Sequence, residues 1–166
     1  MARFFNTAEP NRSEWHYTLP VLERLPEVQR LIAQNGWFML QAPPQSGKTS
    51  FAQALAHELT ASGRFAALDV TCETDLPNGT DPLAASRSVV RNILAAAESL
   101  PRQLRPPASV PAPEQAASCG LGSFLTAWCV ACPLPVVLLL DDIDALQGDA
   151  ITSVLHACSV RKQDVV

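Results

Sequence analysis

The chain lacks the features that mark secreted, membrane-spanning and nucleic-acid-binding proteins. No apolar run approaches the roughly 20 residues that a membrane span needs, and no basic start followed by an apolar centre marks a signal peptide. Only 12 of the 166 residues are lysine or arginine, the net charge is −4, and no basic stripe stands out. We therefore predict a cytoplasmic protein without a membrane partner and without an extended nucleic-acid surface.

The cysteines are too few and too irregularly spaced for a disulfide framework. There are five, an odd number that fits reduced thiols in the cytoplasm. Cys129 and Cys132 form a single Cys-x-x-Cys pair, and a zinc site would have to recruit distant side chains such as Cys119, His156 and Cys158. Because the surrounding residues are apolar with a helical period, we favour small core residues on a helix over a metal or redox role.

What the chain does contain is a phosphate-binding pattern in residues 42–49, Ala-Pro-Pro-Gln-Ser-Gly-Lys-Thr. The general pattern is Gly, four residues, then Gly-Lys-Ser/Thr; Ala42 replaces the first glycine, while Gly47, Lys48 and Thr49 are in place. In such a loop the chain turns from a strand into a helix, so backbone N–H groups and the helix dipole face one centre. The sequence therefore predicts that this loop binds a nucleoside triphosphate.

Each residue at the end of this loop has a different predicted role. Gly47 lets the backbone approach a phosphate closely, Lys48 places its ammonium on the β and γ oxygens, and the Thr49 hydroxyl binds Mg²⁺. The predicted phosphate-binding residues are Gln45, Ser46, Gly47, Lys48, Thr49 and Ser50.

The flanks of the loop support this interpretation. Residues 37–41 form a short apolar run, which predicts a buried parallel strand, and from Lys48 the pattern changes to a helical period that ends near Gly63. A Gly-Lys-Thr tripeptide in a turn would mean little alone, but the order of strand, loop and helix favours a phosphate site. The expected buried stripe of this helix is Phe51, Ala52, Leu55, Ala56 and Leu59.

A second signal lies about ninety residues further on. Residues 136–140 are apolar and run directly into Asp141 and Asp142, which predicts a buried strand that delivers two carboxylates at its carboxyl end. Asp141 would hold Mg²⁺ together with Thr49, and Asp142, the predicted catalytic partner of Lys48, would direct the attacking water. Solvated loop carboxylates are the alternative, but the two motifs occur in the order that a triphosphate site requires.

The rest of the chain supplies the remaining elements. We expect a second strand at 64–70, helices at 81–100, 121–131 and 150–159, and a stiff, exposed, proline-rich connection at 101–115. The side chains expected to face inward on the first of these helices are Leu83, Val90, Ile93, Leu94 and Ala97. On the last helix, Ile151, Val154 and Leu155 are expected to share one face.

On these two motifs the chain resembles bacterial AAA-like P-loop ATPases, in which residues 42–49 correspond to Walker A and 136–146 to Walker B. In that group alanine is usual at Ala42. The resemblance implies a three-layer αβα P-loop NTPase fold with a parallel sheet, ATP and Mg²⁺ as ligands, and hydrolysis as the reaction; ATP rather than GTP rests on it alone. It also implies that Tyr17 and Leu19 cover the adenine.

The resemblance divides the chain into a lead-in with a helix at 1–35 and a partial P-loop ATPase domain at 36–166. Asp142 stands where relatives carry glutamate, and Pro44 where arginine is common. The strand that should lie between the two Walker strands is missing, as are the other carboxy-terminal strands. We therefore expect the amino-terminal part of a longer, truncated ATPase, and a fold that is marginal alone because its strand edges lack partners.

The predicted function is Mg²⁺-dependent ATP binding with hydrolysis. A non-catalytic nucleotide-binding switch or an inactive truncated fragment remains the alternative, because Asp142 is one methylene shorter than glutamate and the central strand is missing. A small-molecule kinase would need an acceptor site and a lid with arginines, and no such cluster follows Asp141. The predicted partner is the nucleotide. The sequence does not decide whether the protein also binds another protein or forms a homo-oligomer.

Overall fold

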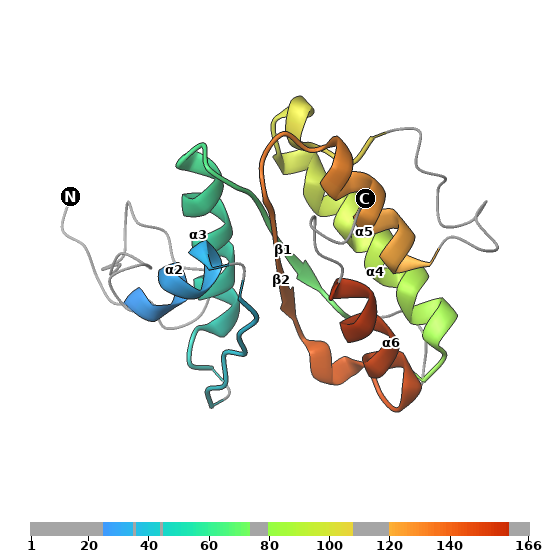
Figure 1. Ribbon diagram of the computed structural model, residues 1–166. Helices are drawn as coiled ribbons and strands as arrows, with labels where there is room; N and C mark the ends of the chain where they lie inside the picture. The colour runs from blue at the N-terminus through green and yellow to red at the C-terminus, as the bar shows by residue number, and fades with distance from the viewer. Residues whose placement is uncertain (1–24, 35, 44, 74–79, 108–119, 160–166) are drawn as a thin grey trace.

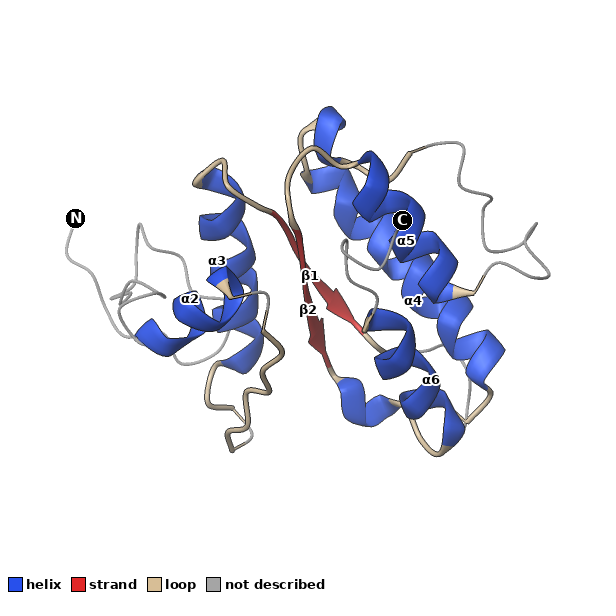
Figure 2. Ribbon diagram, viewed as in Figure 1, coloured by secondary structure: helices blue, strands red, loops and turns tan. Residues whose placement is uncertain are grey.

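The computed structural model describes residues 25–34, 36–43, 45–73, 80–107 and 120–159. These form a mixed α/β arrangement in which helices cover both faces of a small parallel sheet (Figures 1 and 2). The elements are α2 (Pro26–Ala33), α3 (Lys48–Ala61), β1 (Ala66–Thr71), α4 (Pro82–Ala96), the 3₁₀ helices η1 (Ala97–Ser99) and η2 (Arg102–Leu104), α5 (Leu121–Ala131), β2 (Val136–Asp141), the 3₁₀ helix η3 (Ile143–Ala145) and α6 (Asp149–Cys158).

The described sheet consists of β1 and β2, which pair in parallel from Ala66 opposite Val136 to Thr71 opposite Asp141. Most residues of β1 are buried, whereas every residue of β2 is half-buried. This difference arises because α3 and α4 pack more extensively against β1 than against β2. Each strand has only the other beside it among the described residues. The predicted strands at 64–70 and 136–140 are thus confirmed, the first with its bounds shifted by one or two residues.

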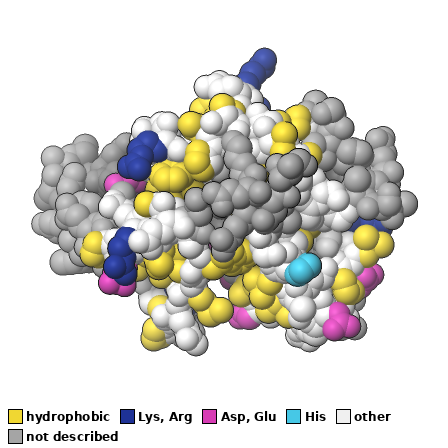
Figure 3. Space-filling view, in the orientation of Figure 1, with side chains coloured by type: hydrophobic (Ala, Val, Ile, Leu, Met, Phe, Trp, Pro, Cys, Tyr) yellow, Lys and Arg dark blue, Asp and Glu magenta, His cyan; other side chains and the backbone are white. Residues whose placement is uncertain are grey.

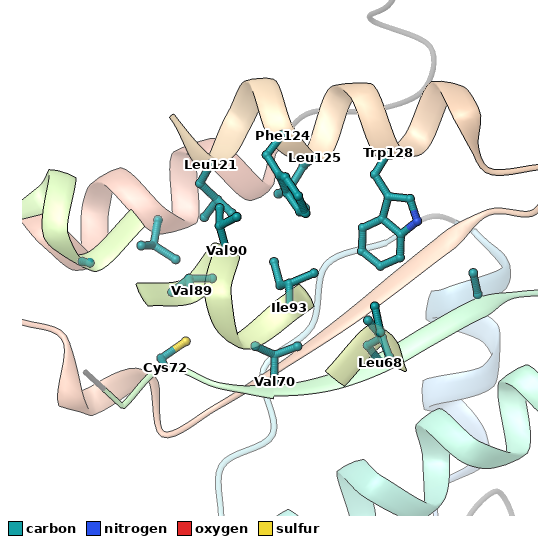
Figure 4. Packing of buried hydrophobic residues seen from close by; sticks show 14 of the residues in the cluster. Leu68, Val70, Cys72, Val89, Val90, Ile93, Leu121, Phe124, Leu125 and Trp128 are labelled. Atoms are coloured by element: carbon teal, nitrogen blue, oxygen red, sulfur yellow. The ribbon is translucent and has the colours of Figure 1, made fainter. Parts of the chain in front are cut away.

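Two hydrophobic clusters hold the layers together. The larger fills the space between one face of the sheet and α4, α5 and α6, and its largest fully buried side chain is Trp128 (Figure 4). The smaller joins α2 and α3 to the other face, with Phe51 and Leu55 packed against Ala67. Strand residues alternate between the two clusters, as the period of a β-strand requires. The sheet therefore has a distinct α3 face and a distinct α4 face.

Local signals set the start of α4 and the end of α3 as predicted, whereas α4 ends at Ala96, before the predicted residue 100. Asp81 caps α4 by accepting hydrogen bonds from the backbone N–H groups of Leu83 and Ala84, and Pro82 is the first helical residue. After α3, Gly63 has a positive φ of 68°, a conformation that glycine adopts without strain. The helices predicted at 121–131 and 150–159 are present as α5 and α6.

The predicted strand at 37–41 is wrong. The described chain there has no regular structure, and Trp37 and Met39 are 51% and 82% exposed. Phe38 alone of this run packs on the smaller cluster. An apolar run becomes a buried strand only beside another strand, and no described strand lies next to this one. Hydrophobic side chains accordingly reach the surface across the middle of the molecule (Figure 3).

Two inward assignments are also wrong. Leu83 and Leu94 are exposed, because the buried stripe of α4 is narrower than its apolar pattern suggests. The described part of the proline-rich connection is less exposed than predicted, since Leu104 is buried and Arg105 donates to the carbonyl oxygen of Leu100 at 2.8 Å.

Replacing Trp128 by phenylalanine should destabilise the fold by about 2 kcal/mol, because its indole N–H donates to the buried Leu104 carbonyl at 2.9 Å. Phenylalanine removes that donor and leaves a small cavity. Urea unfolding of both proteins measures the loss. Trp37→Phe, at an exposed position, should stay within about 0.5 kcal/mol of the wild type. Equal effects of the two substitutions would contradict this account of the core.

Candidate functional site

The loop before α3 has the backbone geometry of a tight turn into a helix. Gly47, the residue that precedes the helix, has φ of 84°, and Gln45 has φ of 59°. No side chain caps this end of α3, and its first turn contains no acidic residue. The positive end of the helix dipole is therefore not neutralised by a carboxylate of the first turn, a condition that favours an anion.

Lys48 is held by the loop that it follows. Its ammonium donates to the carbonyl oxygens of Ala42 at 3.1 Å and Pro43 at 3.3 Å. The backbone N–H of Ser46 also donates to the Pro43 carbonyl, at 3.3 Å. The loop thus folds around the lysine side chain. Of the other predicted phosphate ligands, Thr49 and Ser50 lie in the first turn of α3.

The two aspartates at the end of β2 have different environments. Asp141 Oδ1 accepts the backbone N–H of Asp142 at 3.0 Å, while Asp141 Oδ2 is buried and has no hydrogen-bond partner in the described structure. Asp142 is exposed, has a positive φ of 52°, and accepts a hydrogen bond from the Thr71 hydroxyl at 3.3 Å. Asp142 therefore turns the chain sharply where β2 ends, and its carboxylate is tied to β1.

The start of α3 and the end of β2 lie at the same end of the sheet. Thr60, in the last turn of α3, bonds both backbone groups of Ala67 near the start of β1. Gln53, in the second turn, instead hydrogen-bonds Asp69 further along β1. The helix thus runs antiparallel to β1, so its first residues lie toward the carboxyl ends of both strands (Figure 1).

The predicted metal ligand Asp141 also lies on the α3 face of the sheet. Val137 and Leu139, which alternate with it along β2, pack on the smaller cluster beside α3. Lys48, Thr49 and Asp141 therefore share one end of the sheet and the side of it that α3 covers.

Sequence reasoning missed Asp69, which lies on the same face. Burial raises the pKa of its carboxyl above the usual 3.8, and the nearby Asp141 carboxylate raises it further, while its own backbone N–H and the Gln53 side chain lower it. A lone acid inside the apolar strand 66–70 was the available signal. Thr71 was missed as well, although it is a polar residue at the end of a strand.

The cysteines near the site are protonated. Burial raises the pKa of Cys72 to about 12, with smaller contributions from Cys158, Asp142 and Asp141, and burial raises that of Cys158 to about 11. Both thiols therefore stay neutral and behave as small apolar side chains. Cys132 is buried at the end of α5, where the sequence predicted a core residue, and Cys129 is half-buried.

The chemistry of the donors fits a magnesium ion. A buried carboxylate oxygen without a partner is costly unless a cation or donor satisfies it, and Asp141 Oδ2 is such an atom. Carboxylate and hydroxyl oxygens are the ligands that Mg²⁺ prefers. Within the described residues, no group of three or more His, Cys, Asp or Glu side chains is arranged around a common metal position. One or two carboxylates with phosphate oxygens suffice for Mg²⁺.

No family model matches this chain, and no curated protein or solved structure matches it either. In the described part of the chain, no helix combines the length and apolar character needed to cross a membrane.

Asp69→Asn should alter the pH dependence of stability. Because the folded state raises the Asp69 pKa, it retains this proton more readily than the unfolded chain does. The resulting stabilisation is complete below the unfolded pKa of 3.8 and is lost as the pH rises through the folded pKa. The free energy of unfolding of the variant, minus that of the wild type, should therefore increase as the pH rises from 3.8 through the folded pKa.

Urea titrations at several pH values measure this difference. Glu98→Gln, the same chemical change at an exposed carboxyl, serves as the control and should give no such increase. A difference for Asp69→Asn that stays flat or falls with pH would contradict the assigned environment.

Proposed function

We propose that this protein is a P-loop nucleotide-binding module that binds ATP with Mg²⁺ and hydrolyses it. One observation carries the proposal: the amino-terminal turn of α3, with Lys48, lies at the same end of the sheet as the carboxylates of Asp141, the last residue of β2, and Asp142. Phosphates and a metal ion need these two kinds of group together, because the cation neutralises the anion.

Binding would begin at the loop. Backbone N–H groups of the first turn of α3 point toward the end of the helix, and among the described residues no side chain caps this end and the first turn contains no acidic residue. The Lys48 ammonium would exchange the carbonyls of Ala42 and Pro43 for the β and γ oxygens.

The metal would lie between α3 and β2. Thr49 would supply a hydroxyl from the helix, and Asp141 its buried, unpartnered Oδ2. Mg²⁺ bound there would neutralise phosphate charge during transfer.

Hydrolysis would depend on Asp142. Its carboxylate is the acceptor suited to orient a water molecule, and the hydrogen bond from Thr71 restricts where that carboxylate points. The positive φ of Asp142 is the kind of backbone strain that is concentrated at functional sites.

A non-catalytic nucleotide-binding switch is the second candidate. The observation that favours it is the absence of residues 37–41 from the described sheet, which leaves the chain before the loop without the support of neighbouring strands. The reach of Asp142, one methylene shorter than glutamate, points the same way, since a misplacement of about 1 Å can cost about 100-fold in rate.

Lys48→Ala should weaken ATP binding by about ten- to hundredfold, the value of a hydrogen bond to a charged group. Titration with a fluorescent ATP analogue, with and without Mg²⁺, measures the dissociation constant. The matched control is Arg64→Ala, which removes one positive charge just beyond the other end of α3 and should leave binding unchanged. An equal loss in both variants would indicate nonspecific electrostatics, and no binding by the wild type would overturn the proposal.

Asp142→Asn should lower phosphate release about 100-fold while the dissociation constant for ATP changes by less than about threefold. Asp141→Asn should instead reduce the gain in affinity that Mg²⁺ provides. A phosphate-release assay beside the binding titration separates the two roles. Wild-type binding without release would select the nucleotide-binding switch.

A further inference from the structure

Asn92, on the helix α4 that covers the sheet face opposite α3, hydrogen-bonds the end of β1, and this end of β1 in turn contacts Asp142. Asn92 lies on α4, and its amide nitrogen donates to the carbonyl oxygens of Thr71 at 2.9 Å and Glu73 at 3.4 Å. Both partners are acceptors, so only the NH₂ group of the amide can face them. Asn92 therefore bonds the chain on both sides of Cys72, where β1 ends.

The segment that Asn92 contacts, residues 71–73, hydrogen-bonds the Asp142 carboxylate through the Thr71 side chain. The Thr71 hydroxyl accepts the backbone N–H of Glu73 at 3.1 Å and donates to Asp142 Oδ2 at 3.3 Å. With one bond accepted and its proton donated, the hydroxyl has a defined orientation. Asn92 thus ties the backbone of Thr71 and Glu73 to α4, and the Thr71 side chain ties that backbone to Asp142.

We propose that Asn92 is a positioning residue for ATP hydrolysis, which acts through Thr71 to fix the carboxylate of Asp142. This inference rests on the proposed function and names a residue of that site on a different element. Asn92 touches neither Asp142 nor, in this scheme, the nucleotide.

The physical reason is that Asp142 needs support from outside its own loop. It is exposed and has a positive φ, a conformation that persists when surrounding contacts determine it. Thr71 and Glu73 are exposed too, so neither is fixed by burial. Helix α4 is the rigid element nearby, because Val89 and Ile93 are fully buried in the larger cluster and Asp81 caps its start.

A purely structural role for Asn92 makes a different prediction. If the amide only ties α4 to β1, its removal lowers stability and leaves the catalytic carboxylate unaffected. If it acts through Thr71, its effect on turnover disappears once the Thr71 hydroxyl is gone. A double-mutant cycle separates these outcomes.

The experiment compares the full chain as wild type, Asn92→Ala, Thr71→Val and the double variant. Alanine is the best helix former, so the substitution does not weaken α4 through helix propensity. Single-turnover phosphate release should fall about tenfold in each single variant, with the ATP dissociation constant within about twofold, and the double variant should match Thr71→Val. Additive losses in the double variant, or full turnover in Asn92→Ala, would overturn the proposal.

Amide hydrogen exchange, read by NMR without nucleotide, gives an answer that does not depend on activity. Asn92→Ala should speed exchange of the Glu73 and Asp142 N–H groups about tenfold relative to the rest of the chain. Arg87→Ala, at an exposed position of the same helix, should not. Unchanged exchange at both amides would overturn the positioning role. A wild type that releases no phosphate would overturn hydrolysis as the proposed function, while the exchange result would still decide whether Asn92 organises Asp142.

Discussion

The parallel pairing of β1 with β2 is the contact on which the rest of the structure depends. It brings together two segments that are 71 residues apart in the chain at the Thr71–Asp142 bond, and each hydrophobic cluster forms on one face of the pair. The pairing extends past β1, because the Cys72 N–H donates to the Asp141 carbonyl at 2.8 Å. This hydrogen bond fixes the backbone of Asp141 at the end of β2, from which its side chain projects. The placement of Thr71 beside Asp141 and Asp142 follows from this register.

Much of the fold follows from local signals in the sequence. The bounds of α3 come from the change to a helical period at Lys48 and from Gly63, whose positive φ ends the helix. Asp81 and Pro82 fix the start of α4 in the same way. Helix α5 and strand β2 are both mainly apolar segments but differ in length, and length distinguishes a helix from a strand in such segments. These features need no knowledge of distant residues. The phosphate-loop pattern and the two aspartates are likewise visible in the sequence, as is their order.

The features that could not be predicted from the sequence depend on contacts between residues that are distant in the chain. Residues 37–41 have the composition of a buried strand, but composition cannot show whether a neighbouring strand is there to pair with it. Helical periodicity places Leu94 on the apolar side of α4 without giving the width of the surface that covers it. The bonds from Asn92 to Thr71 and onward to Asp142 join residues of three elements, and their existence depends on the strand register and on how α4 packs. Local pattern carries no information about either.

The Lys48 ammonium has a consequence for the thermodynamics of any anion that reaches the loop. Because it already donates to two carbonyl oxygens, the charge is solvated by the protein before a ligand arrives. An incoming anion must displace those oxygens, so the enthalpy gained is the difference between two sets of hydrogen bonds rather than the full value of a new set. The released carbonyls of Ala42 and Pro43 must then find water. Calorimetric heat at this loop would therefore understate the strength of the lysine–anion contact itself.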